Sequence, residues 1–130
     1  MEFSETRNTS SREFLRLFIA VSRMWVRGEL DPVLEGVETW GAFCARVADG
    51  IRAMTEGADR GATVAAFTSG GAVSVATGAA LGIGDERVIE LSWLVRNTSI
   101  TELIFSPSRV SLAAFNATPH LTDPRTVTVR

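Results

Sequence analysis

The sequence contains no lysine: all 13 basic residues in its 130 positions are arginines. This excludes Schiff-base chemistry and phosphate binding that depends on a lysine. Any bound anion would have to be held by arginine side chains or by backbone amides.

Cysteine and histidine are almost absent, with Cys44 and His120 as the single residue of each type. One cysteine cannot form a disulfide within the chain. A lone cysteine and a lone histidine also do not supply the ligand set of a zinc site. We therefore expect no metal site and no other cofactor.

The chain lacks both an excess of positive charge and a long apolar run. Its net charge is -2, whereas nucleic-acid and anionic-membrane binding usually need a concentrated basic surface. The longest apolar runs, at 17–21 and 63–67, are far shorter than the roughly twenty residues of a membrane-spanning helix. Residues 1–11 are polar, without the apolar region of a signal peptide. We expect a cytoplasmic protein that binds neither nucleic acid nor membranes.

Two long amphipathic helices are predicted in the first half of the chain. Ser10 stands three residues before Glu13 in a capping-box arrangement, and apolar residues then recur every three or four positions until Gly28. Residues 28–36 read as a loop. A second helix is predicted from Glu38 or Thr39 to Gly57, with Trp40, Phe43, Val47, Ile51 and Met54 on one stripe.

The second half reads as a mixture of strands and helices. Residues 62–67 are nearly all apolar and end at a Ser-Gly-Gly turn, which is typical of a strand buried on both faces. The tail from Pro119 reads as irregular. The remaining predicted elements are helices over about 72–81 and 86–91, a hairpin of strands 99–105 and 109–115, and an edge strand over 126–129.

This order of elements predicts one α/β domain over residues 1–130, with helices flanking a mixed parallel and antiparallel sheet. The sheet would be unusually small, because a single buried parallel-type strand and one hairpin face two long amphipathic helices. A strand of that type normally has a neighbour on each side. We therefore expect an incomplete domain.

The most informative motif is the predicted strand–turn–helix junction over residues 64–71, which contains Ser69, Gly70 and Gly71. Backbone amides at such a turn point toward the space beyond the strand, and the helix dipole adds partial positive charge there. Phosphate is a natural occupant. Glycines at such a junction can also serve close packing alone, so both interpretations stay open.

Several segments, taken in order, resemble the C-terminal half of the histidine phosphatase (phosphoglycerate mutase-like) superfamily. The resemblance covers roughly residues 12–121. The matching segments are Glu38-Thr39-Trp40 with the helix after it, the turn at 68–71, the run at 96–103, and Phe115-Asn116-Ala117-Thr118-Pro119-His120-Leu121.

The resemblance implies a three-layer α/β domain with a phosphomonoesterase or phosphomutase reaction that proceeds through a phosphohistidine. In that family an Arg-His-Gly motif ends the first strand and supplies the nucleophile, and a carboxylic acid donates a proton. By this match Glu38 takes the position of the acid, and Ser69 takes the position of the family's second histidine. Ser69, Gly70 and Gly71 would bind the phosphate.

The sequence departs from the family in one decisive respect, because it contains no Arg-His-Gly. Its single histidine, His120, matches an Asn-x-x-x-His-Leu element that looks structural. The resemblance therefore implies a partial domain without the first strand and its nucleophile, and we expect the chain to be inactive on its own.

Three hypotheses follow from these residues. The chain is part of a phosphatase, or it is a non-catalytic binding protein that self-associates through an exposed strand edge. The third is a serine hydrolase, since Ser69, Asp85 and His120 occur in the chain order of α/β-hydrolases. However, Phe67 stands where the Gly-x-Ser-x-Gly motif of those enzymes requires glycine.

Overall fold

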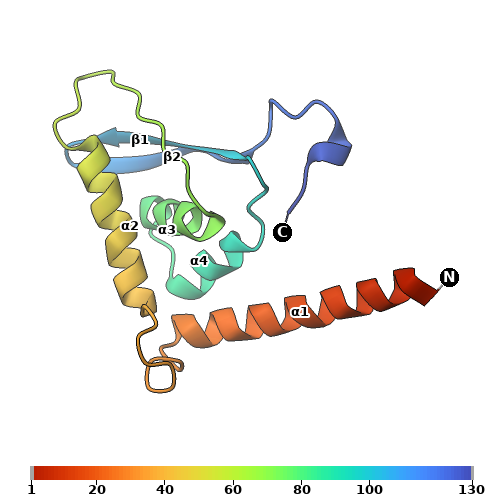
Figure 1. Ribbon diagram of the computed structural model, residues 1–130. Helices are drawn as coiled ribbons and strands as arrows, with labels where there is room; N and C mark the ends of the chain where they lie inside the picture. The colour runs from red at the N-terminus through yellow and green to blue at the C-terminus, as the bar shows by residue number, and fades with distance from the viewer. Residues whose placement is uncertain (1, 130) are drawn as a thin grey trace. The chain divides into compact units, whose positions relative to one another are not determined.

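The computed structural model describes residues 2–129 (Figure 1). The chain divides into two compact units, with the boundary between Trp40 and Gly41. The first unit consists of a long helix and a loop. The second contains three helices and a β-hairpin, so the chain combines helices and strands as the sequence predicts.

The N-terminal unit is built on α1 (Glu2–Val26). This confirms the first predicted helix, which begins eight residues before the capping box at Ser10. Beyond the helix, the Trp25 indole Nε1 donates a hydrogen bond of 2.7 Å to the Glu38 carbonyl. The Trp25 ring also meets the Trp40 ring edge-on, with centroids 5.1 Å apart. These contacts hold the end of the loop against the end of α1.

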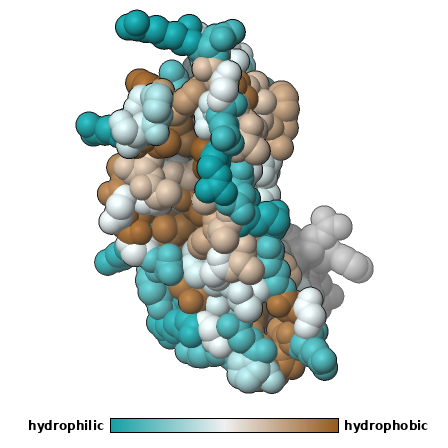
Figure 2. All heavy atoms as spheres, turned by 90° about the vertical axis from the view of Figure 1, so that its left-hand side faces the viewer, coloured by the Kyte–Doolittle hydropathy of each residue, from teal (hydrophilic) through white to brown (hydrophobic). Residues whose placement is uncertain are grey.

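Helix α2 (Trp40–Thr55) confirms the second predicted helix. It ends before Gly57, which has a φ of 74° and so adopts the left-handed conformation that favours glycine. Apolar side chains remain open to solvent on the face that carries α2, interspersed with polar ones (Figure 2).

Helices α3 (Gly70–Leu81) and α4 (Asp85–Ser92) pack closely against each other, and both were predicted. A Cβ atom on Gly78 would lie only 2.3 Å from the Val88 Cγ2 atom, so the helices approach too closely for a side chain at that position. Val75, Val88 and Ile89 are buried in this part of the core. Gly82 ends α3 with a φ of 66°.

The hairpin consists of β1 (Ile100–Ser106) and β2 (Arg109–Ala117), which form an antiparallel pair in which Leu103 is opposite Leu112. Helix α3 contacts both strands. The predicted hairpin is therefore confirmed, with each boundary within two residues of its expected position.

The predicted buried strand over residues 62–67 is wrong. This segment is extended but pairs with no other strand among the described residues, and the Phe67 side chain is 101% exposed. A strand needs a neighbour to accept and donate its backbone hydrogen bonds, and residues 2–129 provide none here. The expected mixed sheet is accordingly reduced to one antiparallel pair, and a three-layer arrangement is not formed by the part of the chain described.

The predicted edge strand over 126–129 is also wrong, because residues Pro124–Thr126 form a 3₁₀ helix and no strand follows it. Two hydrogen bonds with Asn97 hold the tail in place instead. The Asn97 backbone amide donates to the Thr128 carbonyl at 2.8 Å, and the Asn97 side-chain amide donates to the Thr128 hydroxyl at 2.9 Å.

Asn116 fixes the connection between α4 and β1. Its side-chain oxygen accepts a hydrogen bond of 2.7 Å from the Arg96 amide, and its side-chain nitrogen donates one of 2.8 Å to the Leu94 carbonyl. Asn116 has a φ of 57°, and Thr98 in the connection has a φ of 58°. Asparagine tolerates this conformation better than most residues. The Asn-x-x-x-His-Leu element thus has a structural role through its asparagine.

Candidate functional site

The turn before α3 carries the predicted phosphate-binding residues. Ser69 is the N-cap residue of α3, with extended backbone angles, and its side chain makes no capping hydrogen bond. Gly70 and Gly71 are the first residues of the helix. Amides in a first helical turn have no acceptor within the helix, and the helix dipole places partial positive charge beside them. Ser69 is exposed, so its hydroxyl can meet an anion from solvent, whereas Gly70 and Gly71 are half-buried.

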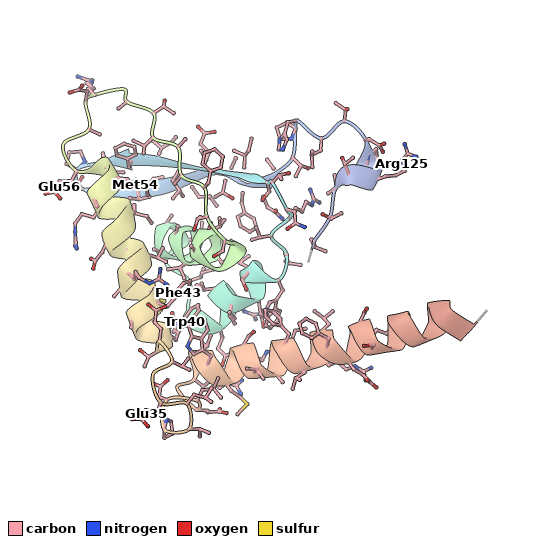
Figure 3. The ribbon with its side chains drawn as sticks, viewed as in Figure 1. Glu35, Trp40, Phe43, Met54, Glu56 and Arg125 are labelled. Carbon is pink, nitrogen blue, oxygen red and sulfur yellow. The ribbon has the colours of Figure 1, made fainter. Side chains whose placement is uncertain are left out.

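The helix α2 packs beside this turn through Phe43, which projects from α2 in Figure 3. A Cβ atom on Gly71 would lie 3.4 Å from the Phe43 Cζ atom, so glycine here permits close packing as well as access to the backbone. The close-packing interpretation of the glycines therefore has structural support at Gly71, and the phosphate-binding interpretation stays a prediction.

Arg46 brings a positive charge to the same neighbourhood. Its guanidinium carbon lies 5.2 Å from the centroid of the Phe43 ring, within the range of a cation–π contact. The i, i+3 spacing of Phe43 and Arg46 is the signal that could have indicated their contact.

Glu38, the predicted acid, is exposed and lies two residues before the start of α2. Its carbonyl accepts the hydrogen bond from Trp25, which positions its backbone. Glu38 belongs to the N-terminal unit, whereas Ser69, Gly70 and Gly71 belong to the C-terminal unit. The joint action of these four residues stays a prediction.

The residues of the serine hydrolase hypothesis do not form a triad in the described part of the chain. The Nε2 atom of His120 lies 3.4 Å from the Thr98 hydroxyl, and no hydrogen bond joins His120 to Ser69 or to Asp85. Asp85 instead lies near Cys44. Burial raises the pKa of the Cys44 thiol, and the negative charge of Asp85 raises it further. This thiol is therefore less readily ionised than an exposed one.

Residues 2–129 contain no group of three or more histidine, cysteine, aspartate or glutamate side chains that could hold a metal ion. Within the same range, every helix is too short or too polar to cross a bilayer.

Comparison with known proteins supplies one match. A search of curated proteins and a search of solved structures found no match. The family model described as the histidine phosphatase superfamily (branch 1) matches residues 1–118, which is most of the chain. The match includes α2, the turn before α3 and the whole hairpin. The chain therefore belongs to the histidine phosphatase superfamily.

Proposed function

We propose that this chain provides part of a phosphomonoester hydrolase site, namely a phosphate-facing turn and an acid, and that it does not hydrolyse phosphomonoesters on its own. One observation carries the proposal: the single histidine, His120, is exposed and lies beside the Thr98 hydroxyl. No Arg-His-Gly occurs in the sequence. A phosphoenzyme reaction needs a nucleophile, and His120 does not match that position in the family.

The α3 turn supports the phosphate-binding part of the proposal. The Ser69 hydroxyl would donate a hydrogen bond to a phosphoryl oxygen, and the amides of Gly70 and Gly71 would donate others. Serine brings no charge, whereas a protonated histidine in its place would. We expect positive charge from Arg46 to compensate in part, since this side chain lies over Phe43, which packs against Gly71.

Glu38 is the proposed proton donor to the leaving group. Its exposed position gives a substrate access to the carboxyl group. An acid must carry a proton at neutral pH, and a bound phosphate dianion nearby would favour the protonated form through charge repulsion. Glu38 would therefore become an effective acid only with substrate in place.

The exposed segment over 62–67 supports the incomplete state of the domain. Its apolar side chains suit a buried strand, yet Phe67 is fully open to solvent. A neighbouring strand that carried the nucleophile would bury this segment and complete the site. We propose that such a strand is encoded outside this sequence.

The test of inactivity is an assay of the purified chain with para-nitrophenyl phosphate. We expect no turnover above background for the wild-type chain or for Glu38→Gln. Robust turnover that Glu38→Gln abolishes would contradict the proposal, since it would require a nucleophile that we have not identified. Reading the DNA upstream of the first codon for a strand ending in Arg-His-Gly tests the origin of the missing part.

A non-catalytic binding role is the second candidate, and it is favoured by the serine at position 69. Titration with inorganic phosphate, followed by the amide NMR signals of Gly70 and Gly71, measures binding directly. We expect these signals to shift in the wild-type chain and to shift less in Ser69→Ala. The matched control is Ser108→Ala in the exposed hairpin turn, which should respond as the wild type does. Unchanged Gly70 and Gly71 signals would exclude the turn as a phosphate site.

A further inference from the structure

Helix α1 carries an exposed stripe of large apolar side chains. Phe14, Leu17, Val21 and Met24 follow one another at steps of three, four and three residues, which places them on one face of the helix. Their exposed fractions range from 38% at Met24 to 69% at Phe14. The described part of the chain therefore leaves this apolar stripe largely uncovered, although apolar surface is most stable away from water.

Arginines occupy the opposite face of the same helix. Arg12, Arg16, Arg23 and Arg27 follow one another at steps of four, seven and four residues, so they also share one face. The Arg27 amide donates to the Arg23 carbonyl at 3.1 Å, which continues the helical turn past the last residue of α1. Arg12 and Arg16 stand two positions on either side of Phe14, and residues two positions apart lie about 200° apart around a helix. The arginines therefore point away from the apolar stripe.

This part of the chain has a local excess of positive charge. Residues 12–27 contain four arginines and one glutamate, a net charge of +3 in a chain whose total is -2. Arg27 lies 4.0 Å from Glu29, but both side chains are about half exposed, so solvent screens this pair. The expectation of no membrane binding rests on the net charge of the whole chain, which does not reveal this local excess.

We propose that α1 lies on the surface of a bilayer that contains anionic lipid, with the apolar stripe inserted at the level of the head groups. A helix with phenylalanine and leucine on one face and arginine on the other binds at such an interface. Complementary charge selects this occupant. Anionic head groups attract the four arginines, whereas the same segment of a second copy would repel them. This role goes beyond the proposed function.

The packing beside the stripe favours a flat surface over the groove of a protein. Ser22 is only 9% exposed. Trp25, one turn beyond Val21, donates to the Glu38 carbonyl and meets the Trp40 ring. The chain itself therefore occupies the side of α1 next to the stripe. A groove would have to contact the helix on both sides of its apolar face, whereas a bilayer needs only the face that is free.

The first test is sedimentation of the full chain with lipid vesicles. We expect binding to vesicles of phosphatidylcholine mixed with phosphatidylserine, weak binding to phosphatidylcholine alone, and release as the salt concentration rises. Leu17→Ser should weaken binding about tenfold, because it removes apolar surface from the stripe. Arg12→Gln combined with Arg16→Gln should weaken binding to the mixed vesicles at least about fivefold.

Three matched controls come from outside α1. Ile104→Ser changes an apolar residue of the hairpin that is 61% exposed, and Arg109→Gln changes an exposed arginine. Ser69→Ala changes the turn that we propose to face phosphate. All three should bind the mixed vesicles as the wild type does. Circular dichroism of each variant confirms that the helices are retained.

The second test reports how α1 is oriented on the bilayer. Cys44 is the only cysteine, so Cys44→Ser combined with Leu17→Cys provides one thiol on the stripe for an environment-sensitive fluorophore. Cys44→Ser combined with Arg16→Cys provides one on the opposite face. Mixed vesicles should shift the emission of the label at position 17 to shorter wavelength and leave that of the label at position 16 nearly unchanged.

Four results would overturn the proposal: no binding to the mixed vesicles, equal binding to neutral vesicles, full binding by Leu17→Ser, or equal shifts of the two labels. A dimer of the free chain that Leu17→Ser dissociates, without vesicle binding, would instead assign the stripe to a second copy. Both vesicle types carry phosphate groups, and Ser69→Ala separates the turn from α1. Failure here therefore leaves the proposed function untouched, and failure of the phosphatase proposal leaves the membrane contact untouched.

Discussion

The uncharged stretch over residues 61–84 contains two regions of similar composition with opposite environments. Residues 62–67 are extended and exposed, whereas α3, which begins three residues later, contains the buried residues Ser74, Val75, Thr77 and Gly78. The difference lies in the neighbours. Helix α3 packs on α4 and on the hairpin, while no described element covers the segment before it. Apolar sequence creates a tendency toward burial, but a complementary surface decides whether burial occurs.

The largest expected loss of stability comes from a substitution at Gly78, where α3 packs against α4. We expect Gly78→Ala to lower the free energy of unfolding by about 2 kcal/mol, because the added methyl group must displace Val88 or shift α4. Urea unfolding measures the change. The control is Gly50→Ala in α2, where a Cβ atom would meet nothing within 4 Å. That variant should gain up to about 1 kcal/mol from helix propensity. Equal effects in the two variants would contradict the close approach of α3 and α4.

A matched pair of valine substitutions sharpens the comparison directly. Val75 in α3 is 7% exposed and Val64 in the preceding segment is 42% exposed. We expect Val75→Ala to cost about 2 kcal/mol through lost burial and the cavity it leaves. Val64→Ala should change stability by less than about 0.5 kcal/mol when measured in dilute, monomeric protein. A large loss for Val64→Ala would show that the segment is packed in solution.

The smallest expected effect concerns the tail, which is ordered by polar contacts at the surface. A hydrogen bond from the Arg125 side chain lowers the pKa of Asp123, and one from the Arg125 amide lowers it further. The stabilisation is present while Asp123 is ionised and is lost as the pH falls through its lowered pKa. We expect Arg125→Ala to raise that pKa, as measured by NMR titration, with little change in stability because both groups are exposed. Arg109→Ala serves as the control and should leave the pKa of Asp123 unchanged.

The periodicity of apolar residues predicted the helices well, because the preferences of such elements are largely local. The capping box at Ser10 did not mark the start of α1, which begins at Glu2. The spacing of apolar residues identified α1 and α2, and Gly82 marked the end of α3. The prediction of a strand over residues 62–67 failed for a physical reason. Apolar composition indicates that burial is favourable, but pairing requires a second strand that is remote in sequence.

The candidate site was predictable only in part. The turn at Ser69 could be identified because a serine and two glycines precede a helical pattern. The contact of Phe43 with Gly71 joins two separate helices, so spacing within either helix does not reveal it. The sequence also did not predict that Asn116 fixes the connection before β1, since its partners Leu94 and Arg96 lie about twenty positions earlier in the chain.

The contact between Asn97 and Thr128 has a consequence for the order in which the protein can fold during synthesis. The two residues are separated by 31 positions. The turn around Asn97 emerges from the ribosome together with α4, but its partner has yet to be translated. The hairpin can form in the interval, since its two strands are adjacent. The contacts between Asn97 and Thr128 can therefore form only after the hairpin, whose Asn116 already fixes the connection to α4.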